Sequence, residues 1–423
     1  MLIGWATPFN YRSAIGKFSL SVANELVERG HEVVILRTET GPELELAPLK
    51  SDLQVVSCHE ADFSRFDELV MNFGNHAPYH SQCIPVLGER APFGIFHDAE
   101  MKDFAWGLAH RHGLNLPSLP GYDGATETWE EGSLVSPGSA PLLASMAAMC
   151  WGAMVHAPHY FGVISDHCPG PVGVASLCYP DPGEKRTLAA LAAKPIKVTI
   201  FGVITEHKQP GRAMRALAQL VGEFGSIELH LAGAIEDRLK FELNELATGL
   251  GIQPPVYHGY LSDEDLQSTI EASSIVLVLR FPVTEGGSAS LATALYRGRP
   301  IIVADIAAYS MVPDNLVKKV SYGEDPTDLA SAMRDILRDP EGAHLTASRA
   351  TDWAEREFQA TRYCDALLEA LTQRERFAGL AQLARRSAGA LTTSSGEHDV
   401  AAVHRFAEAM DWLHSAGEGS DAK

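Results

Sequence analysis

The sequence predicts an α/β protein of two Rossmann-like, doubly wound domains that face each other across a cleft. A chain of 423 residues is longer than one typical domain. Short aliphatic runs alternate with amphipathic helical segments in both halves. The alternation restarts after a linker-like stretch, Tyr179–Pro195, for which a short helix is expected. We therefore predict an N-terminal domain over residues 1–182 and a C-terminal domain over residues 194–354. Helices between about 355 and 423 are expected to pack back on the first domain.

The composition indicates a soluble globular protein. Hydrophobic residues make up 46% of the chain and charged residues 21%, which are ordinary values. The net charge of −20 argues against the basic face that nucleic acid or an anionic lipid surface selects. The beginning, MLIGWATPFNYRS, lacks the basic and apolar regions of a signal peptide. We expect a cytoplasmic protein without a nucleic-acid partner.

The cysteines and one uncharged segment support this interpretation. The six cysteines have no paired spacing, which indicates buried free thiols in a reducing compartment: Cys58, Cys83, Cys150, Cys168, Cys178 and Cys364. Residues 132–165 contain no charged side chain, but serine, glycine, histidine and proline interrupt them. We predict a buried helix running into a buried strand there, and no membrane span.

The N-terminal half begins with a strand over Met1–Ala6, a loop, and a helix over Phe18–Arg29 that Gly16 and Lys17 open. A second strand follows at Glu32–Leu36. Further strands are predicted at Leu53–Val56, Leu69–Phe73, Phe93–Phe96, Ala153–His156 and Val172–Leu177. Residues 113–138, rich in glycine, proline and acidic residues, are expected to form a long surface loop over the cleft.

Two of these strands end in polar residues. Asn75, His76 and His80 follow one strand, and His97 and Asp98 end another. Because the carboxyl ends of parallel strands meet at one edge of the sheet, these side chains are expected to converge on one cleft. The alternative for the last pair is a helix cap, with Asp98 as the N-cap and His97 exposed.

The C-terminal half repeats the alternation. Its predicted strands are Ile196–Phe201, Ile227–Leu231, Val256–His258, Ile275–Leu279, Ile301–Ala304 and Val317–Ser321. Its predicted helices are Arg212–Phe224, Arg238–Leu250, Asp263–Ala272, Ala289–Tyr296, Pro326–Arg338 and Leu345–Arg376. Two more amphipathic helices are expected after Phe377, with a disordered end.

The stretch around Glu285 is the strongest candidate for a ligand site. Glu285 and the Gly286-Gly287-Ser288 turn lie between a buried strand and a helix. A helix N-terminus at the carboxyl end of a parallel strand favours phosphate. The alternative is an ordinary crossover with a flexible turn.

Two basic residues are predicted near the same edge of the sheet. Lys208 follows the first strand of the second domain within the loop GVITEHK, and can reach a phosphate at the turn; a solvated surface lysine is the alternative. Arg280 ends the strand before the turn. An arginine directly after an aliphatic run is more often functional or ion-paired than free.

Five segments, taken in order, resemble the retaining nucleotide-sugar glycosyltransferases of family 4, which have the two-domain GT-B fold. They are SAIGKFSLSVANELVERGHEVVIL, FGNHAPYH, FGIFHDAEM, VTIFGVITEHKQPGRAMRAL and EGGSASLATALYRGRPII. The resemblance covers the chain to about residue 370. It implies transfer of a hexose from a nucleotide diphosphate sugar to a saccharide, lipid-linked or secondary-metabolite acceptor, with retained configuration.

The resemblance also implies roles for single residues. Glu285 matches the glutamate that binds donor-sugar hydroxyls. Gly286, Gly287 and Ser288 would offer backbone N–H groups to the diphosphate, with Lys208 as a counter-charge that stabilises the leaving group. No metal and no cofactor are implied, because the lysine and the helix dipole supply positive charge. The remaining positions are assigned to the phosphates (Gly16, Gly202), the base (Gly259, Tyr260), the transferred sugar (His97) and the acceptor (Asn75, His76, His80, Asp98).

Two positions depart from the family pattern and keep a rival hypothesis open. Thr293 stands where a second glutamate would bind the ribose, and Val203 where an arginine often follows Gly202; Arg280 is a candidate substitute. The rival is a catalytically silent GT-B protein that acts as a partner or scaffold for another transferase. A nucleotide-sugar epimerase would need more acid and base residues than the first domain offers. The sequence predicts neither the donor base and sugar nor the oligomeric state.

Overall fold

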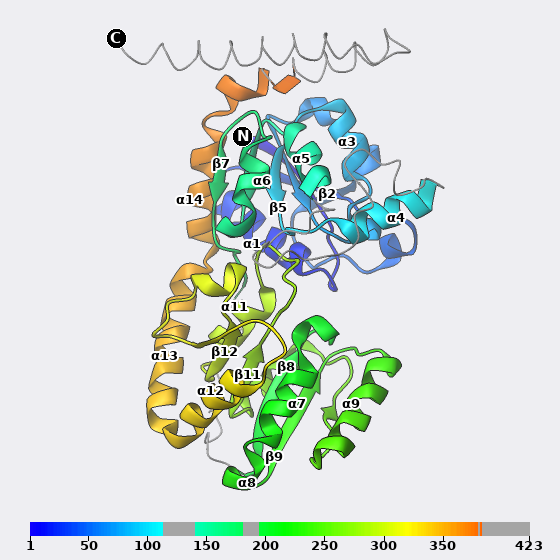
Figure 1. The fold of residues 1–423 in the computed structure, drawn as a ribbon. Coiled ribbons are helices and arrows are strands. Elements are labelled where there is room, and N and C mark those ends of the chain that lie inside the picture. Colours follow the sequence, from blue (N-terminus) through cyan, green and yellow to red (C-terminus); the bar gives the residue numbers. More distant parts are fainter. Residues whose placement is uncertain (113–139, 181–193, 380, 383–423) are drawn as a thin grey trace.

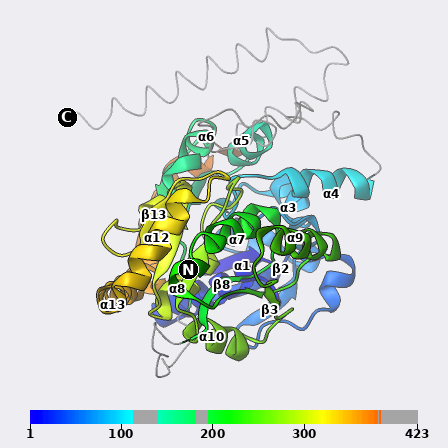
Figure 2. The same cartoon turned by 60° about the horizontal axis from the view of Figure 1, so that its bottom comes forward.

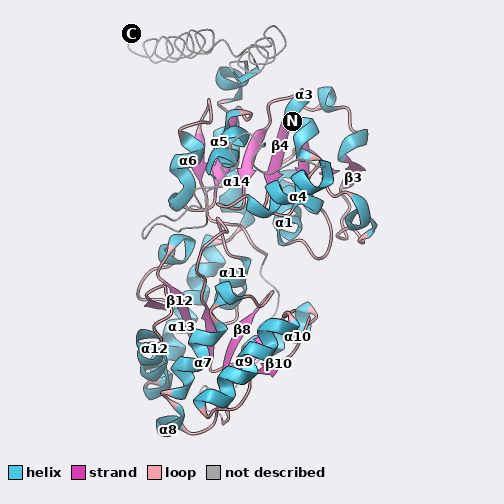
Figure 3. Cartoon of the chain, turned by 45° about the vertical axis from the view of Figure 1, so that its right-hand side comes forward, coloured by secondary structure: helices cyan, strands magenta, loops and turns pink. Residues whose placement is uncertain are grey.

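The computed structural model describes residues 1–112, 140–180, 194–379 and 381–382. The predicted loop over residues 113–138, most of the linker and the predicted helices after residue 382 lie outside the described residues. The chain forms two α/β lobes, one above the other in Figure 1, and each has a parallel sheet between layers of helices (Figure 3).

The N-terminal domain has a seven-stranded parallel sheet in the order β3-β2-β1-β4-β5-β6-β7. Its strands are β1 (Leu2–Thr7), β2 (Glu32–Arg37), β3 (Gln54–Ser57), β4 (Glu68–Phe73), β5 (Phe93–Phe96), β6 (Gly152–Val155) and β7 (Val172–Val174). Its helices are α1 (Ala14–Glu28), α2 (Ala77–His80), α3 (Cys83–Glu89), α4 (Lys102–His112), α5 (Ala140–Ala148) and α6 (Phe161–Ser165). The strand order reverses between β1 and β4, which is where open α/β sheets bind ligands.

The C-terminal domain has a six-stranded parallel sheet in the order β10-β9-β8-β11-β12-β13. Its strands are β8 (Ile196–Phe201), β9 (Ile227–Ala232), β10 (Val256–Tyr257), β11 (Ile275–Val278), β12 (Ile301–Ala304) and β13 (Lys318–Val320). Its helices are α7 (Pro210–Ala218), α8 (Val221–Phe224), α9 (Asp237–Leu250), α10 (Asp263–Glu271), α11 (Ala289–Tyr296), α12 (Thr327–Arg338) and α13 (Pro340–Glu357). The reversal lies between β8 and β11.

Both sheets are covered on both faces, which explains why the central strands β5, β11 and β12 are apolar throughout. In the C-terminal domain α7, α9 and α12 share one core with the sheet, and α10, α11 and α13 share the other. Figure 2 shows α7 and α9 on the opposite side of β8 from α10. The predicted fold class is therefore confirmed.

After α13 the chain returns to the first domain as α14 (Ala360–Leu371), which lies beside β7 in Figure 1. Tyr363, Leu367 and Leu371 are buried in the core that covers one face of the N-terminal sheet, together with Phe18 of α1. The helix therefore joins the two lobes a second time.

Three predicted helices differ from the observed ones by more than one residue at an end. The first helix begins at Ala14 because Ser13 caps it and accepts a hydrogen bond from Gly16 N at 3.0 Å. The predicted helix Arg212–Phe224 is two helices, α7 and α8. The predicted helix Leu345–Arg376 is also two, because the chain passes between domains at Phe358, which is buried in the C-terminal core. The strand predicted to end at Leu177 ends at Val174.

The apolar segment before β6 behaves as predicted, since α5 runs into β6 and both belong to the core. Within the described residues, no helix is both long enough and apolar enough to cross a membrane. All six cysteines are buried free thiols.

Candidate functional site

A cavity of about 390 Å³ lies between the two domains, at the carboxyl ends of both sheets. Its N-terminal wall comes from the loops that follow β1, β4 and β5, and its C-terminal wall from the segment after β11. The lining residues are Arg12, Ser13, Ala14, Ile15, Asn75, His76, Tyr79, His80, His97, Asp98, Asp103, Leu177, Arg280, Thr284, Glu285, Gly287 and Ala289. Side chains that the sequence singled out in both halves thus meet in one place.

Backbone hydrogen bonds join the walls of the cavity. Asp98 and Glu285 form an antiparallel bridge, and Gly286 N donates to His97 O at 2.8 Å. Ala99 N donates to Thr284 O at 2.9 Å. The turn before α11 is therefore paired with the end of β5 like a short strand. Its position depends on how the domains are docked.

The two glycines of this turn are required by packing on the N-terminal domain. A Cβ on Gly286 would lie 2.1 Å from the hydroxyl oxygen of Tyr160, in η5 (Pro158–Tyr160). A Cβ on Gly287 would lie 2.9 Å from Leu177 Cβ. Distances below 3 Å to these groups leave no room for a larger residue.

This geometry corrects one predicted role. The N–H of Gly286 is bonded to His97 O, so it does not point at a ligand. Within the described residues the N–H groups of Gly287 and Ser288 have no protein acceptor. The Ser288 hydroxyl caps α11 by accepting from Leu291 N at 3.2 Å. Two N–H groups at the positive end of α11, those of Gly287 and Ser288, are thus available to a ligand.

Glu285 is surrounded by cations and hydroxyls. Its carboxylate accepts a hydrogen bond from the Tyr309 hydroxyl in η7 (Ala307–Met311). Arg280 Nη2 lies 3.6 Å from Glu285 Oε2. Burial acts to raise the pKa of Glu285, but Arg280, Tyr309 and Lys208 outweigh it and hold the pKa below its ordinary value. Glu285 is therefore an anion that accepts hydrogen bonds.

Lys208 lies at the end of η6 (Glu206–Lys208) and points back over the end of β8. Its Nζ donates to Phe201 O at 2.7 Å and packs over Gly202, where an added Cβ would lie 3.1 Å from it. Burial, and then repulsion by Arg280, lowers its pKa to about 8. Its half-buried, hydrogen-bonded position contradicts the alternative of a fully solvated surface lysine.

Asp98 and His97 both line the cavity, and Asp98 does not cap a helix, so the helix-cap alternative is wrong. Asp98 Oδ2 accepts from Asn75 N at 2.7 Å, and α4 begins only at Lys102. Burial, reinforced by Glu285, raises the pKa of Asp98 to about 7. His97 is 6% exposed. Its Nε2 lies 2.9 Å from Asn72 Oδ1, and its Nδ1 lies 3.0 Å from His156 Nε2.

The other predicted acceptor residues differ in how accessible they are. Asn75 Oδ1 accepts from Phe104 N at 3.0 Å, which fixes the side chain. His80 is buried against Asn72 O at 3.0 Å, and burial lowers its pKa to about 3. His76 is exposed and contacts the ring of Tyr79 edge-on. His76 is thus the predicted acceptor residue most open to a ligand.

Several predicted donor positions are not among the residues that line the cavity: Gly16, Gly202, Lys208, Gly259, Tyr260, Gly286, Ser288 and Thr293. Gly16 is a glycine because a Cβ would lie 2.9 Å from Pro8 O. Gly259 has a positive φ of 67°, and Tyr260 is 73% exposed. The Thr293 hydroxyl is hydrogen-bonded to Tyr179.

A salt bridge crosses between the domains near Thr293 and Tyr260. Lys17 of α1 binds Asp263 of α10 at 2.9 Å, and Lys17 is close enough to Tyr179 and Tyr260 to interact electrostatically with both. Val203, at the other departure from the family pattern, is 66% exposed.

The sequence did not single out His156, Tyr160, Tyr309 or Asn72. His156 directly follows β6, and its position at the carboxyl end of a strand is the signal that could have identified it. Tyr160 and Tyr309 lie in short 3₁₀ helices without any distinctive spacing. In the part of the chain that the structure describes, no group of three metal-ligating side chains is present.

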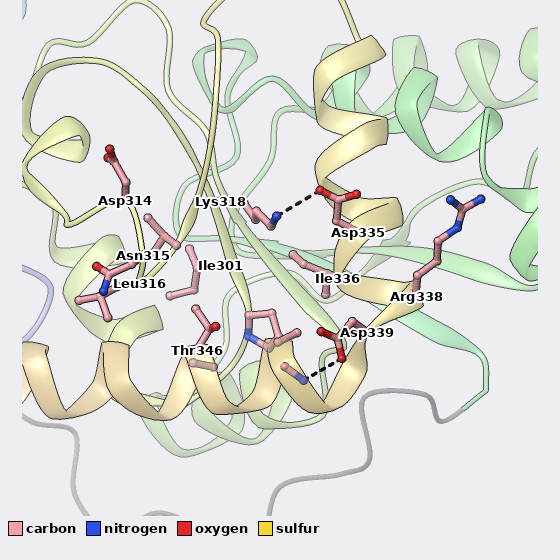
Figure 4. Close-up of a pocket in the computed structure, with 15 residues that line it drawn as sticks. Ile301, Asp314, Asn315, Leu316, Lys318, Asp335, Ile336, Arg338, Asp339 and Thr346 are labelled. Carbon is pink, nitrogen blue, oxygen red and sulfur yellow. Dashed lines mark hydrogen bonds and ion pairs between the residues drawn. The ribbon is translucent and has the colours of Figure 1, made fainter.

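A second cavity, of about 530 Å³, lies at the opposite end of the C-terminal sheet between α12 and α13 (Figure 4). It borders the beginnings of β12 and β13, whereas open α/β sheets bind ligands at the strand ends. Lys318 points at Asp335, 3.1 Å away, and Asp339 accepts from Gly342 N at 3.0 Å (Figure 4). These charged groups already have partners, so the interdomain cavity is the better candidate.

Comparisons with known proteins give the family to which part of the chain is similar and the fold of the whole. Residues 184–353 match the model of a family described as glycosyl transferases group 1. No curated protein sequence matches the chain significantly. HepE of Anabaena, solved with UDP and glucose, has a similar structure with a TM-score of 0.61 and 14% identity, over 88% of this chain and 100% of HepE.

Two further solved structures are similar over most of both chains. Sucrose-phosphate synthase of Thermosynechococcus elongatus has a TM-score of 0.61 and 13% identity, covering 90% of this chain and 100% of the synthase. WaaG, a glycosyltransferase involved in lipopolysaccharide biosynthesis, has a TM-score of 0.56 and 12% identity, covering 86% and 98%. The chain therefore has the two-domain GT-B fold, and its C-terminal domain matches the glycosyl transferases of group 1.

Proposed function

We propose that the chain is a retaining glycosyltransferase that moves a hexose from a nucleotide diphosphate sugar to a saccharide, lipid-linked or secondary-metabolite acceptor. One observation carries the proposal. The anion Glu285 and the cation Arg280 line the cavity between the domains beside the open N-terminus of α11, and Lys208 is close enough to interact electrostatically with both. This arrangement faces the end of β5, where His97 and Asp98 lie.

In the proposed reaction the positive groups hold the diphosphate. The leaving nucleoside diphosphate gains negative charge as the glycosidic bond breaks, and preorganised cations and N–H groups stabilise that charge. Lys208, Arg280 and the free N–H groups of Gly287 and Ser288 are suited to this role. Arg280 would supply the cation that Val203 does not. The proposal needs neither a metal ion nor a cofactor.

Glu285 and the first domain would bind the sugars. As an ionised carboxylate, Glu285 accepts hydrogen bonds from donor-sugar hydroxyls, and Arg280 orients it. The acceptor would enter along His76, Asp98 and Asp103, which line the N-terminal wall. HepE was solved with UDP and with UDP-glucose, so uridine donors are the first to test.

The second candidate function is a catalytically silent partner or scaffold of another transferase. Two observations favour it: the Thr293 hydroxyl is already bonded to Tyr179, and Val203 is exposed without a charge to offer. A scaffold of this kind does not need the charged groups that surround Glu285. Burying such groups costs free energy unless they serve a ligand or one another.

Product analysis tests the proposal. The protein is incubated with uridine, guanosine, adenosine and thymidine diphosphate sugars and a panel of saccharide acceptors, and the released nucleoside diphosphate is quantified. NMR of the product reads the anomeric configuration. We expect release with one donor and retained configuration. An inverted product contradicts the retaining mechanism, and binding of a donor without any turnover favours the scaffold.

A further inference from the structure

A row of hydrogen bonds runs behind the cavity from β1 to β7 through two histidine rings. Asn72 Nδ2 donates to Ala6 O at 3.0 Å, so that Asn72 Oδ1 faces His97 Nε2 at 2.9 Å. His97 Nδ1 lies 3.0 Å from His156 Nε2, and His156 Nδ1 lies 3.2 Å from Ala175 O. Both ends of the pair of rings therefore meet an oxygen acceptor.

The row needs more protons than two neutral rings carry. An N–H is required at His97 Nε2 for Asn72 and at His156 Nδ1 for Ala175, and a third is required between the rings. A neutral imidazole has one N–H, and an imidazolium has two. Two neutral rings leave one of the three contacts without a proton. A single extra proton, shared by the pair, completes all three.

Burial opposes that extra proton. Ring edges of Phe18 contact both imidazoles, with centroids 4.8 and 5.6 Å away. Burial lowers the pKa of His97 well below its ordinary value, and that of His156 to about 4. The titratable groups that face the pair come from α2, η5, α14 and the cavity: His80, Tyr160, Tyr363, Asp98, Arg280 and Glu285. With the cavity empty, we expect a neutral pair.

We propose that His156 is a positioning residue for His97, and that the two rings act as one proton-binding unit that takes up a proton when a diphosphate occupies the cavity. This inference rests on the proposed function. A nearby anion favours the charged form of a histidine, and the added N–H completes the unfilled contact. Since both ring nitrogens of His97 face protein atoms, the pair would act on a bound diphosphate through its charge.

Calorimetry with UDP as the probe tests this inference. Binding heats measured at pH 7 in buffers of different ionisation enthalpy give the number of protons taken up. His156→Gln keeps an acceptor for His97 Nδ1 and a donor for Ala175 O, so it preserves the proton deficit. His156→Phe removes both groups, and a neutral His97 then satisfies Asn72. We expect uptake of about one proton more in the parent and His156→Gln than in His156→Phe.

Lys208 and Asp98 also change their protonation when an anion binds, but they contribute equally to all three proteins and cancel in the difference. Equal proton uptake in the three proteins overturns the inference even when UDP binds normally. Failure of UDP and of every other nucleotide to bind is a different result, because it counts against the proposed function.

Histidine ring ¹⁵N spectra of the unmodified chain decide the question without a ligand. Signals of the two rings are identified by their loss in His97→Gln and His156→Gln. A shared unit predicts that the two rings titrate together and take up one proton between them as the pH falls. Two rings that titrate independently, each taking up its own proton, contradict it.

Discussion

Glu285 shows how the environment of one residue decides what it can do. Burial alone would favour the neutral acid, but Arg280, Tyr309 and Lys208 keep it ionised. The same cluster favours the charged form of Glu285 but disfavours that of Lys208, since burial and Arg280 lower the pKa of Lys208 to about 8. For Asp98, burial and Glu285 outweigh the hydrogen bond from Asn75 N and the charge of Arg280, and they raise its pKa to about 7.

Replacing Glu285 by glutamine is expected to reduce sugar transfer about 100-fold or more, because the amide cannot accept hydrogen bonds from sugar hydroxyls at both positions. The measurement is the rate of nucleoside diphosphate release with the donor identified by screening. Asp335→Asn, which alters a carboxylate in the second cavity, is the matched control and is expected to leave the rate unchanged. Unaltered turnover in Glu285→Gln would show that the motif is misaligned.

The affinity for UDP is expected to fall as the pH rises through about 8, because Lys208 loses its proton there and with it the charge that holds the diphosphate. Calorimetric titration between pH 7 and 9 measures this. Lys208→Arg keeps its charge over the whole range and should remove the part of the dependence centred near pH 8, whereas Lys208→Met should bind weakly at every pH. Identical pH profiles for the parent and Lys208→Arg would exclude Lys208 as the source.

Asp98 should make the fold less stable as the pH rises. Its pKa is raised, so the folded state keeps a proton that the unfolded state has released. The resulting stabilisation is complete below the unfolded pKa of about 3.9 and is lost as the pH rises through about 7. Asp98→Asn should therefore raise Tm at pH 8 relative to the parent and leave it similar at pH 4. A variant that is less stable than the parent at pH 8 would contradict this account.

At the scale of elements, the turn before α11 belongs structurally to both domains. Its backbone pairs with the end of β5, and Gly286 packs directly on the Tyr160 hydroxyl. Glu285 lies inside this paired segment. The position of its carboxylate is therefore set by the joint between the domains as well as by the helix that follows.

Gly286→Ala is expected to disrupt the joint, because the new Cβ would lie 2.1 Å from the Tyr160 hydroxyl oxygen. We expect a loss of about 1–3 kcal/mol in the free energy of unfolding, which is typical of overpacking, together with weaker UDP binding. Denaturant unfolding and calorimetry measure the two effects. Gly249→Ala in α9 meets no atom within 4 Å and should be neutral or slightly stabilising. Equal free energies of unfolding for the two variants would contradict the packing of this turn on the first domain.

The elements themselves were largely predictable from the sequence. Strands such as β5 and β12 were predicted at their observed bounds because a strand buried on both faces needs an uninterrupted apolar run. The helix breaks were less predictable. Phe358 separates α13 from α14 because it packs in the C-terminal core, whereas the residues of α14 pack in the N-terminal core. No local sequence signal marks this passage between domains.

Site residues were predictable from the sequence where they directly follow a parallel strand, because the sheet topology then fixes the edge at which they lie. His97, Asp98, Arg280 and Glu285 could be assigned to one edge because each follows a parallel strand. Tyr160 could not, because it contacts Gly286 across the joint between the domains. Tyr309 could not, because it reaches Glu285 from a short 3₁₀ helix that lies later in the same domain. The same holds for the bond from Gly286 N to His97 O: the sequence predicts an N–H group at a helix mouth, but not that another domain accepts its hydrogen bond.

At the scale of the whole molecule, two lobes are connected both by the linker and by α14. Leu367 and Tyr363 of α14 are buried against α1 and the N-terminal sheet, although the helix follows the C-terminal domain in the chain. The ion pair of Lys17 with Asp263 and the paired turn also join the two lobes. Weakening the packing of α14 should therefore destabilise the first domain.

Leu367→Ala is expected to lower the free energy of unfolding by about 2–5 kcal/mol, as for other fully buried leucines. Leu368→Ala, one position along the same helix and only partly buried, should cost less. Urea unfolding followed by the fluorescence of Trp5 and Trp151, both buried in the N-terminal core, measures the difference. Equal effects of the two substitutions would contradict the docking of α14 on the first domain.

The central claim is that the cleft between the domains binds a nucleotide sugar, and a donor screen by calorimetry tests it most directly. The protein is titrated with uridine, guanosine, adenosine and thymidine diphosphate sugars and with the free nucleoside diphosphates, in parallel with Lys208→Met. We predict that at least one nucleotide sugar binds the parent and that Lys208→Met weakens this binding. Absence of binding by every nucleotide at millimolar concentration would contradict the account.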